Sequence, residues 1–163
     1  MLYVCNVDES SAANGNAQSQ RVAAMAKEQG AGAIAISARI EEELTQLPPQ
    51  DRSEYLEGLG LAEPGLNRLI RAGYDLLGLI TFFTAGPKEA RAWTVEKGAR
   101  APRAASVIHS DFEKGFIRAE TIAYADFVAH GGEQGAKDAG RMRLEGADYV
   151  VQDGDVMHFR FNV

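Results

Sequence analysis

The chain has 163 residues, of which 45% are hydrophobic and 25% are charged, and its formal net charge is −6. These values are typical of a globular protein with one medium domain or two small ones. The acidic balance argues against a protein that coats nucleic acid without sequence preference. No stretch approaches the roughly 20 apolar residues that a membrane helix needs.

Cysteine and histidine are scarce. The single cysteine, Cys5, excludes an intramolecular disulfide and a cysteine-based zinc site, and it favours a cytoplasmic setting. Cys5 lies in an apolar run, so we expect it to pack in the interior rather than react. His109, His130 and His158 are far apart and have no ligand-like spacing. We therefore expect no metal site and treat these histidines as structural, with partner contact as the alternative for His109.

The first half of the chain, residues 1–78, predicts an α/β arrangement. Residues 2–5 and 33–36 are short, continuous apolar runs that are typical of buried parallel strands. Residues 10–19 are small and polar and predict a loop, and residues 18–29 predict a helix that Gly30 ends. Three further helices are expected, over residues 41–47, 51–59 and 66–77. The acidic run at residues 41–43 predicts a solvated helix start rather than a metal site.

The second half, residues 79–163, predicts a sheet packed on one helix. Strands are expected at residues 80–84, 89–96, 116–122, 149–151 and 156–163, and helices at 102–112 and 133–139. In the last strand, Met157, Phe159, Phe161 and Val163 alternate with polar residues and should share one face. This order predicts an α+β fold but does not specify its topology.

The most basic stretch of the chain surrounds the only tryptophan. Because Arg and Lys contact phosphate and an aromatic ring can stack on a base, the stretch predicts a surface that faces RNA or the ribosome. A solvated strand edge is the alternative. The residues concerned are Arg91, Trp93, Lys97, Arg100 and Arg103.

Three long segments resemble the YchF-type (Obg-like) family of P-loop ATPases. They are residues 81–94 (TFFTAGPKEARAWT), 108–120 (IHSDFEKGFIRAE) and 148–162 (DYVVQDGDVMHFRFN). The resemblance covers essentially the whole chain. It implies that residues 1–78 are the C-terminal part of a P-loop G domain and that residues 79–163 are a TGS domain with the β-grasp (ubiquitin-like) fold.

The same resemblance implies a nucleotide-base site. Residues 6–9 (NVDE) resemble the family's Asn-x-x-Glu base-recognition motif, and residues 37–39 (SAR) resemble its later Ser-Ala-Lys motif. An Asn amide can pair with the N6/N7 edge of a purine, and the carboxyl ends of parallel strands are suited to a ligand crevice. A Glu in place of the guanine-binding Asp is one methylene longer and should put its carboxylate elsewhere. The resemblance implies that ATP is accepted, often in preference to GTP. The candidate base-binding residues are Asn6, Val7, Glu9, Ser37, Ala38 and Arg39.

The phosphate-binding part of such a site is missing from this sequence. No Gly-x-x-x-x-Gly-Lys-[Ser/Thr] motif occurs, and the glycine-rich residues 132–137 have the wrong spacing. The family's magnesium-binding and water-positioning residues lie upstream of the matching region. We therefore expect a segment of a longer nucleotide hydrolase that uses Mg²⁺ with ATP or GTP, while this segment alone is neither catalytic nor a tight nucleotide binder.

The resemblance also implies the setting of the longer protein. We expect it to be cytoplasmic and associated with the ribosome, on the large subunit, or with RNA. The alternative is a stand-alone, non-catalytic β-grasp module that binds RNA or the ribosome. In a complete G domain, strands 2–5 and 33–36 would pair with strands from outside this segment. Their free edges therefore predict poor order over the first 40 residues or non-native self-association.

Overall fold

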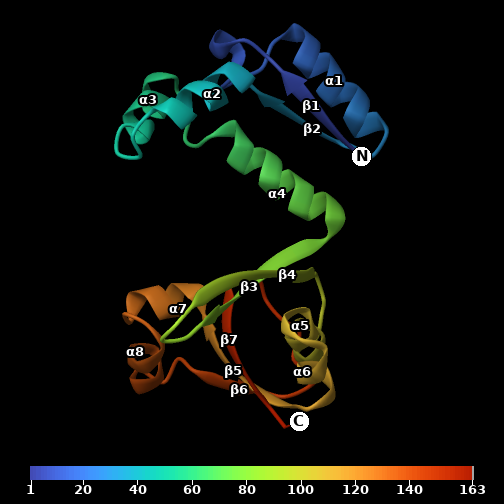
Figure 1. The fold of residues 1–163 in the computed structure, drawn as a ribbon. Helices are drawn as coiled ribbons and strands as arrows, with labels where there is room; N and C mark the ends of the chain where they lie inside the picture. The colour runs from blue at the N-terminus through green and yellow to red at the C-terminus, as the bar shows by residue number, and fades with distance from the viewer. Residues whose placement is uncertain (163) are drawn as a thin grey trace. The chain divides into compact units, whose positions relative to one another are not determined.

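The computed structural model describes residues 1–162, which form two compact units that divide between Leu77 and Gly78 (Figure 1). No helix in this described range is long and apolar enough to cross a membrane. Val163, which the alternating pattern placed on a core face, lies outside the described residues.

The first unit is built on a parallel pair of strands, as predicted. Strand β1 (Leu2–Asn6) pairs in register with β2 (Gly32–Ile36), and α1 (Ala17–Glu28) connects them. Asn16 begins α1 with a capping box, because its side chain accepts from Ser19 N at 2.9 Å while Ser19 Oγ accepts from Asn16 N at 2.8 Å. Gly30 follows the helix with a φ of 65°, a left-handed conformation that favours glycine.

The two strands are less buried than the apolar pattern predicted. Cys5 is only half-buried, and Val4 is 46% exposed. The expected loop at 10–19 is also shorter, because a 3-10 turn, η1 (Glu9–Ser11), and the start of α1 occupy part of it. Helices α1 and α4 pack on the parallel pair, but no further strand among the described residues of this unit pairs with it. The missing strand neighbours explain why Val4 and Cys5 are not fully buried.

Three helices complete the first unit: α2 (Ala38–Gln46), α3 (Arg52–Gly58) and α4 (Gly65–Leu77). Helix α2 begins three residues before the predicted Glu41. A small core between α2 and α3 contains Ile40, Leu44 and Leu56. Helix α4 begins one residue before the predicted Leu66, and its apolar face is only partly covered within the unit: Ile70 is 50% exposed.

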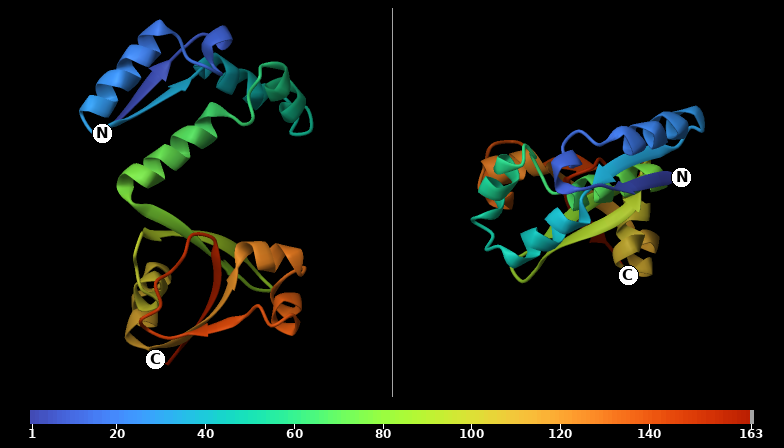
Figure 2. Two further views of the ribbon diagram at one scale, coloured as in Figure 1. Left: turned by 180° about the vertical axis from the view of Figure 1, so that it is seen from behind. Right: turned by 90° about the horizontal axis from the view of Figure 1, so that it is seen from above.

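The second unit is a five-stranded mixed sheet in the order β4-β3-β7-β5-β6 (Figure 2). Its strands are β3 (Leu79–Ala85), β4 (Ala90–Glu96), β5 (Phe116–Ala123), β6 (Arg143–Glu145) and β7 (Asp155–Phe161). Strand β7 lies in the middle, parallel to β3 and antiparallel to β5. The last strand in the sequence therefore joins the two halves of the sheet.

One face of this sheet carries the core. Helices α5 (Ala101–Ile108) and α6 (Ser110–Lys114) pack on it, and the predicted strand residues Met157 and Phe159 are 1% and 7% exposed. Phe82 is fully buried and meets Phe159 edge to face at 6.0 Å. Pro102 lies in the first turn of α5, where its missing N–H is not needed.

One predicted strand of this unit was wrong, and two elements were missed. Residues 149–151 do not form a strand, because they pair only through one isolated antiparallel bridge, in which Ala101 N donates to Tyr149 O and Val151 N donates to Ala99 O. Conversely, helix α7 (Tyr124–Ala129) and strand β6 carry no clear periodic pattern and were missed. The predicted small helix is present as α8 (Glu133–Asp138).

Candidate nucleotide-base site and basic surface

The two predicted base-recognition segments meet at the carboxyl ends of β1 and β2. Asn6 ends β1 opposite Ile36, the last residue of β2. Its side-chain Oδ1 accepts a hydrogen bond from Ala38 N at 3.0 Å, and Val7 N donates to Ile36 O at 2.8 Å. These bonds tie the Asn-Val-Asp-Glu segment to the Ser-Ala-Arg segment, so residues 32 positions apart form one edge.

Charged side chains add a second link between the same segments. Arg39 Nε lies 2.9 Å from Glu9 Oε1 and 3.4 Å from Glu43 Oε1. The other oxygen of Glu43 accepts a hydrogen bond from the Tyr55 hydroxyl on α3. Arg39 therefore stands between two carboxylates, and the chain of contacts runs from the η1 turn through α2 to α3.

Hydrogen bonding sets the ionisation of this network. The bond from Tyr55, helped by Arg39, holds the pKa of Glu43 below its usual value. The same bond raises the pKa of Tyr55, because it is made to the neutral phenol. Asp8, whose side chain caps the η1 turn by accepting from Ser11 N, also has a lowered pKa because of its bonds to Ser11 and Ser10. Glu43 and Asp8 are thus anionic at neutral pH.

The remaining predicted base-site residues lie at the same edge. Val7 and Ser37 are buried, at 8% and 3% exposure. The Ser37 hydroxyl has no hydrogen-bond partner among residues 1–162. An unsatisfied buried hydroxyl costs about 1–3 kcal/mol, and natural structures contain few of them.

The predicted basic stretch is less open than its sequence indicates. Arg100 lies 2.9 Å from Asp148, and Arg103 lies 3.3 Å from Glu96. Arg91 instead stacks on the Trp93 ring, with its guanidinium carbon 4.1 Å from the ring centroid. The indole Nε1 donates to Thr84 Oγ1 at 2.9 Å, which fixes the ring on the β3–β4 hairpin.

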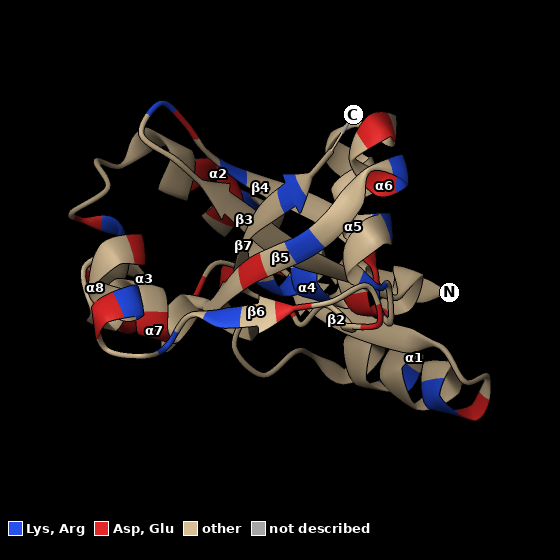
Figure 3. Ribbon diagram, turned by 90° about the horizontal axis from the view of Figure 1, so that it is seen from below, with Lys and Arg blue, Asp and Glu red and all other residues tan. Residues whose placement is uncertain are grey.

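Opposite charges are interspersed in much of the second unit. Strand β5 carries one arginine and one glutamate, and so does β6, and Figure 3 shows blue and red segments on both. Arg91 and Lys97 have no carboxylate partner within the described part of the chain. These two residues are therefore the members of the predicted basic stretch whose positive charge is not paired with a carboxylate.

Sequence reasoning missed two members of the network around the predicted base-recognition segments, Glu43 and Tyr55. A signal existed for Glu43, which follows Arg39 by four residues on a helix and so lies on the same face. Nothing in the sequence pointed to Tyr55, because α3 meets α2 only through the tertiary fold.

Comparison with known proteins gives consistent matches. A family model described as "YchF-GTPase_C: Protein of unknown function (DUF933)" matches residues 79–162. The "Ribosome-binding ATPase YchF" of Haemophilus influenzae is 59% identical over 162 residues, which cover 99% of this chain and 44% of that protein. The protein of the same name from Bacillus subtilis is 54% identical over 165 residues, covering 100% and 45%.

Solved structures agree with the sequence matches. The YchF GTPase of Schizosaccharomyces pombe superposes with a TM-score of 0.82 at 33% identity, covering 98% of this chain and 43% of that one. A GTP-binding protein from Pyrococcus horikoshii shares the fold, with a TM-score of 0.66 at 21% identity over 99% of this chain and 46% of that one. The chain spans less than half the length of the relatives it matches.

Proposed function

Since this chain belongs to the YchF family, as the sequence resemblance predicted, we propose that it contributes the purine-base site and a TGS interaction domain to a ribosome-associated ATP or GTP hydrolase. The observation that carries this proposal is the hydrogen bond from Ala38 N to Asn6, which joins the two base-recognition segments. The relatives named as ribosome-binding ATPases support the ribosomal setting and a cytoplasmic location.

The bonded state of Asn6 suggests how a purine is held. Its Oδ1 is occupied by Ala38 N, which leaves the Nδ2 group to donate to N7 of the base. Adenine and guanine share N7, so Asn6 recognises a purine without distinguishing the two. The distinction falls to Glu9, whose carboxylate is paired with Arg39 and is therefore less available to the N1 and N2 donors of guanine. We infer a preference for ATP on this basis.

Phosphate chemistry lies with residues that this sequence does not contain. Mg²⁺ bound with the nucleotide would neutralise charge on the transferring phosphoryl group, and the described residues offer no motif for it. This chain's part is to bind and orient the base, at residues 6–9 and 37–39.

The domain assignment follows from the same reasoning. We propose that residues 1–78 complete a G domain and that residues 79–163 are a TGS domain of the β-grasp class. In support, the second unit has a mixed sheet with β7 between β3 and β5, and one helical layer, α5 and α6, on the core face. This unit would carry the contact with the ribosome or RNA through Arg91, Trp93 and Lys97.

The base-site proposal is tested by nitrogen-15 NMR of the 163-residue chain titrated with adenosine, ATP and GTP. We expect weak, fast-exchange binding, with shift changes confined to residues 6–9 and 37–39. Adenosine and ATP should give equal affinities, because the chain binds only the base. The substitution Asn6→Ala should abolish the changes, while Asn67→Ala on α4 should leave them intact. Tight ATP binding, or shifts elsewhere, would contradict the proposal.

The ribosome contact is tested by co-sedimentation with ribosomes. Reversing the uncompensated charges in the variant Arg91→Glu/Lys97→Glu should lower the pelleted fraction more than reversing Arg100 and Arg103, whose charges are already paired. The matched control is Arg21→Glu/Lys27→Glu on α1, which makes the same change of charge in the other unit. Equal effects of all three variants would indicate bulk charge rather than a surface. Retained RNA binding without ribosome binding would favour the alternative, a stand-alone RNA-binding module.

A further inference from the structure

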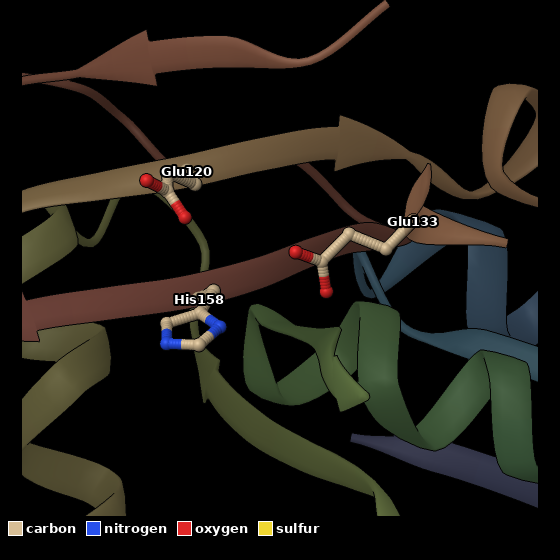
Figure 4. Close-up of side chains that lie close together, drawn as sticks. All are labelled: Glu120, Glu133 and His158. Carbon is tan, nitrogen blue, oxygen red and sulfur yellow. The ribbon is translucent and has the colours of Figure 1, made fainter. Parts of the chain in front are cut away.

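Two glutamates and a histidine converge on the face of the second unit's sheet that α5 and α6 leave open (Figure 4). Glu120 on β5 and His158 on β7 are directly opposed cross-strand partners, and Glu133 reaches them from the first turn of α8. One carboxylate oxygen of each glutamate and one imidazole nitrogen all lie within 4.8 Å of one another. Three elements thus bring three potential ligand atoms to one point.

The three side chains line one small cavity, whose other walls are largely apolar. Two methionines, two branched aliphatic residues and an alanine complete the lining. Because these walls are apolar, the two glutamates and the histidine are the polar side chains that line the cavity. The lining residues are Ala85, Ile122, Met142, Val156 and Met157.

The donor atoms are largely unused within the protein. Among residues 1–162, neither Glu133 nor His158 makes a hydrogen bond or an ion pair with another side chain. Glu120 gives only Oε2 to Arg160 Nη2, at 3.0 Å, which leaves its Oε1 for another partner. Arg160 thus compensates the charge of Glu120, whereas Glu133 has no cationic partner among the described residues.

The backbone that presents Glu133 is fixed rather than loose. Gly132 has a φ of 117°, which other residues rarely adopt. A Cβ on Gly135 would lie 1.9 Å from His130 O, and Ala136 is fully buried. The glycine-rich run at residues 132–137, which has the wrong spacing for phosphate, here turns the chain so that Glu133 faces the strands.

We propose that Glu120, Glu133 and His158 bind a divalent transition-metal cation, with Zn²⁺ as the best match. Mg²⁺ and Ca²⁺ prefer ligand sets made entirely of oxygen, whereas an imidazole nitrogen together with carboxylates suits zinc. Three protein ligands leave a fourth tetrahedral position for water. At Zn–ligand distances of about 2.1 Å the donor atoms lie about 3.4 Å apart. Closure from separations that are all within 4.8 Å requires side-chain movement, which the exposed Glu133 permits.

The proposal is tested on the 163-residue chain by calorimetric titration with Zn²⁺ and by absorption spectroscopy with Co²⁺. We expect saturable binding of one ion and visible absorption of tetrahedral or five-coordinate Co²⁺. The variants Glu133→Gln and His158→Gln should each weaken binding by at least about tenfold, since each removes one of three ligands. Both side chains are exposed, so these variants should fold like the parent chain.

The matched control is His130→Gln, which removes an exposed histidine outside the cluster and should bind Zn²⁺ like the unchanged chain. Cys5 is present in every variant, so any contribution from its thiol cancels in the comparison. Zn²⁺ binding that Glu133→Gln and His158→Gln leave unchanged would overturn the site. Equal affinity for Mg²⁺ would overturn the assignment to a transition metal.

Discussion

Replacing Asp155 with asparagine tests a buried polar network at the start of β7. The Asp155 side chain is 3% exposed and accepts from Tyr149 Oη at 2.7 Å, from Gln152 N at 2.9 Å and from Arg143 Nη2 at 3.3 Å. Asn keeps the shape but replaces one acceptor with a donor that faces these donors. Because a hydrogen bond to a charged group contributes about 1.5–3 kcal/mol and the buried carboxylate accepts three, we expect Asp155→Asn to lower the free energy of unfolding of the second unit by about 3 kcal/mol.

Urea denaturation followed by tryptophan fluorescence measures this loss. Trp93 is the only tryptophan and lies on β4, so it reports the second unit alone. With a urea m-value of about 1–3 kcal/mol/M, the midpoint should fall by about 1–3 M while the slope stays the same. The control Asp148→Asn makes the same chemical change at a side chain that is 93% exposed, and should cost less than about 1 kcal/mol. Equal midpoints for the two variants would refute the assignment of the stability to the buried network.

Three further predictions follow from individual contacts. Burial and the bond to Asp155 raise the pKa of Tyr149 to about 12. In the unfolded chain this phenol ionises at about pH 10, so its contribution to stability is complete below that pH and is lost as the pH rises toward 12. Urea titrations at alkaline pH should therefore show that the stability difference between the parent chain and Tyr149→Phe shrinks over this pH range. The variant Asn6→Ala removes the hydrogen-bond acceptor for Ala38 N. The rate of amide hydrogen exchange at Ala38 should therefore rise roughly fivefold, the equivalent of about 1 kcal/mol. An unchanged exchange rate would show that the bond does not persist in solution. The variant Gly73→Ala adds a Cβ that meets no atom within 4 Å inside α4 and should stabilise the helix by about 0.8 kcal/mol, seen as slower amide exchange in α4.

Most of the secondary structure was predictable because its signals are local. The alternation of residues 156–161 and the capping glycine after α1 each depend on neighbouring residues. The exposed apolar face of α4 was not predictable, because periodicity shows which face is apolar and not whether anything covers it. The strand expected at residues 149–151 was wrong for a related reason: the fold gives this segment a single bridge, from Val150 to Arg100, and the local pattern does not show how long a partner is available.

The candidate sites also differ in whether a local sequence signal points to them. Motif spacing pointed to residues 6–9 and 37–39, and the structure brings both segments together, while their binding role stays a prediction. The cluster of Glu120, Glu133 and His158 has no spacing that a sequence search would find. Its members come from two strands and a helix that adjoin only when the sheet has formed.

The central position of β7 governs the order in which the second unit can be made. Strands β3 and β5 pair with β7 and not with each other, although both precede it in the sequence. Until the ribosome has added residues 155–161, β3 and β5 lack their partner, so the β3–β4 hairpin and the β5–β6 pair each expose an edge that β7 covers in the finished sheet. Contacts of such long sequence separation form late and slowly, which makes this stage prone to aggregation. A message that ends before Asp155 should consequently yield insoluble protein rather than a smaller folded one.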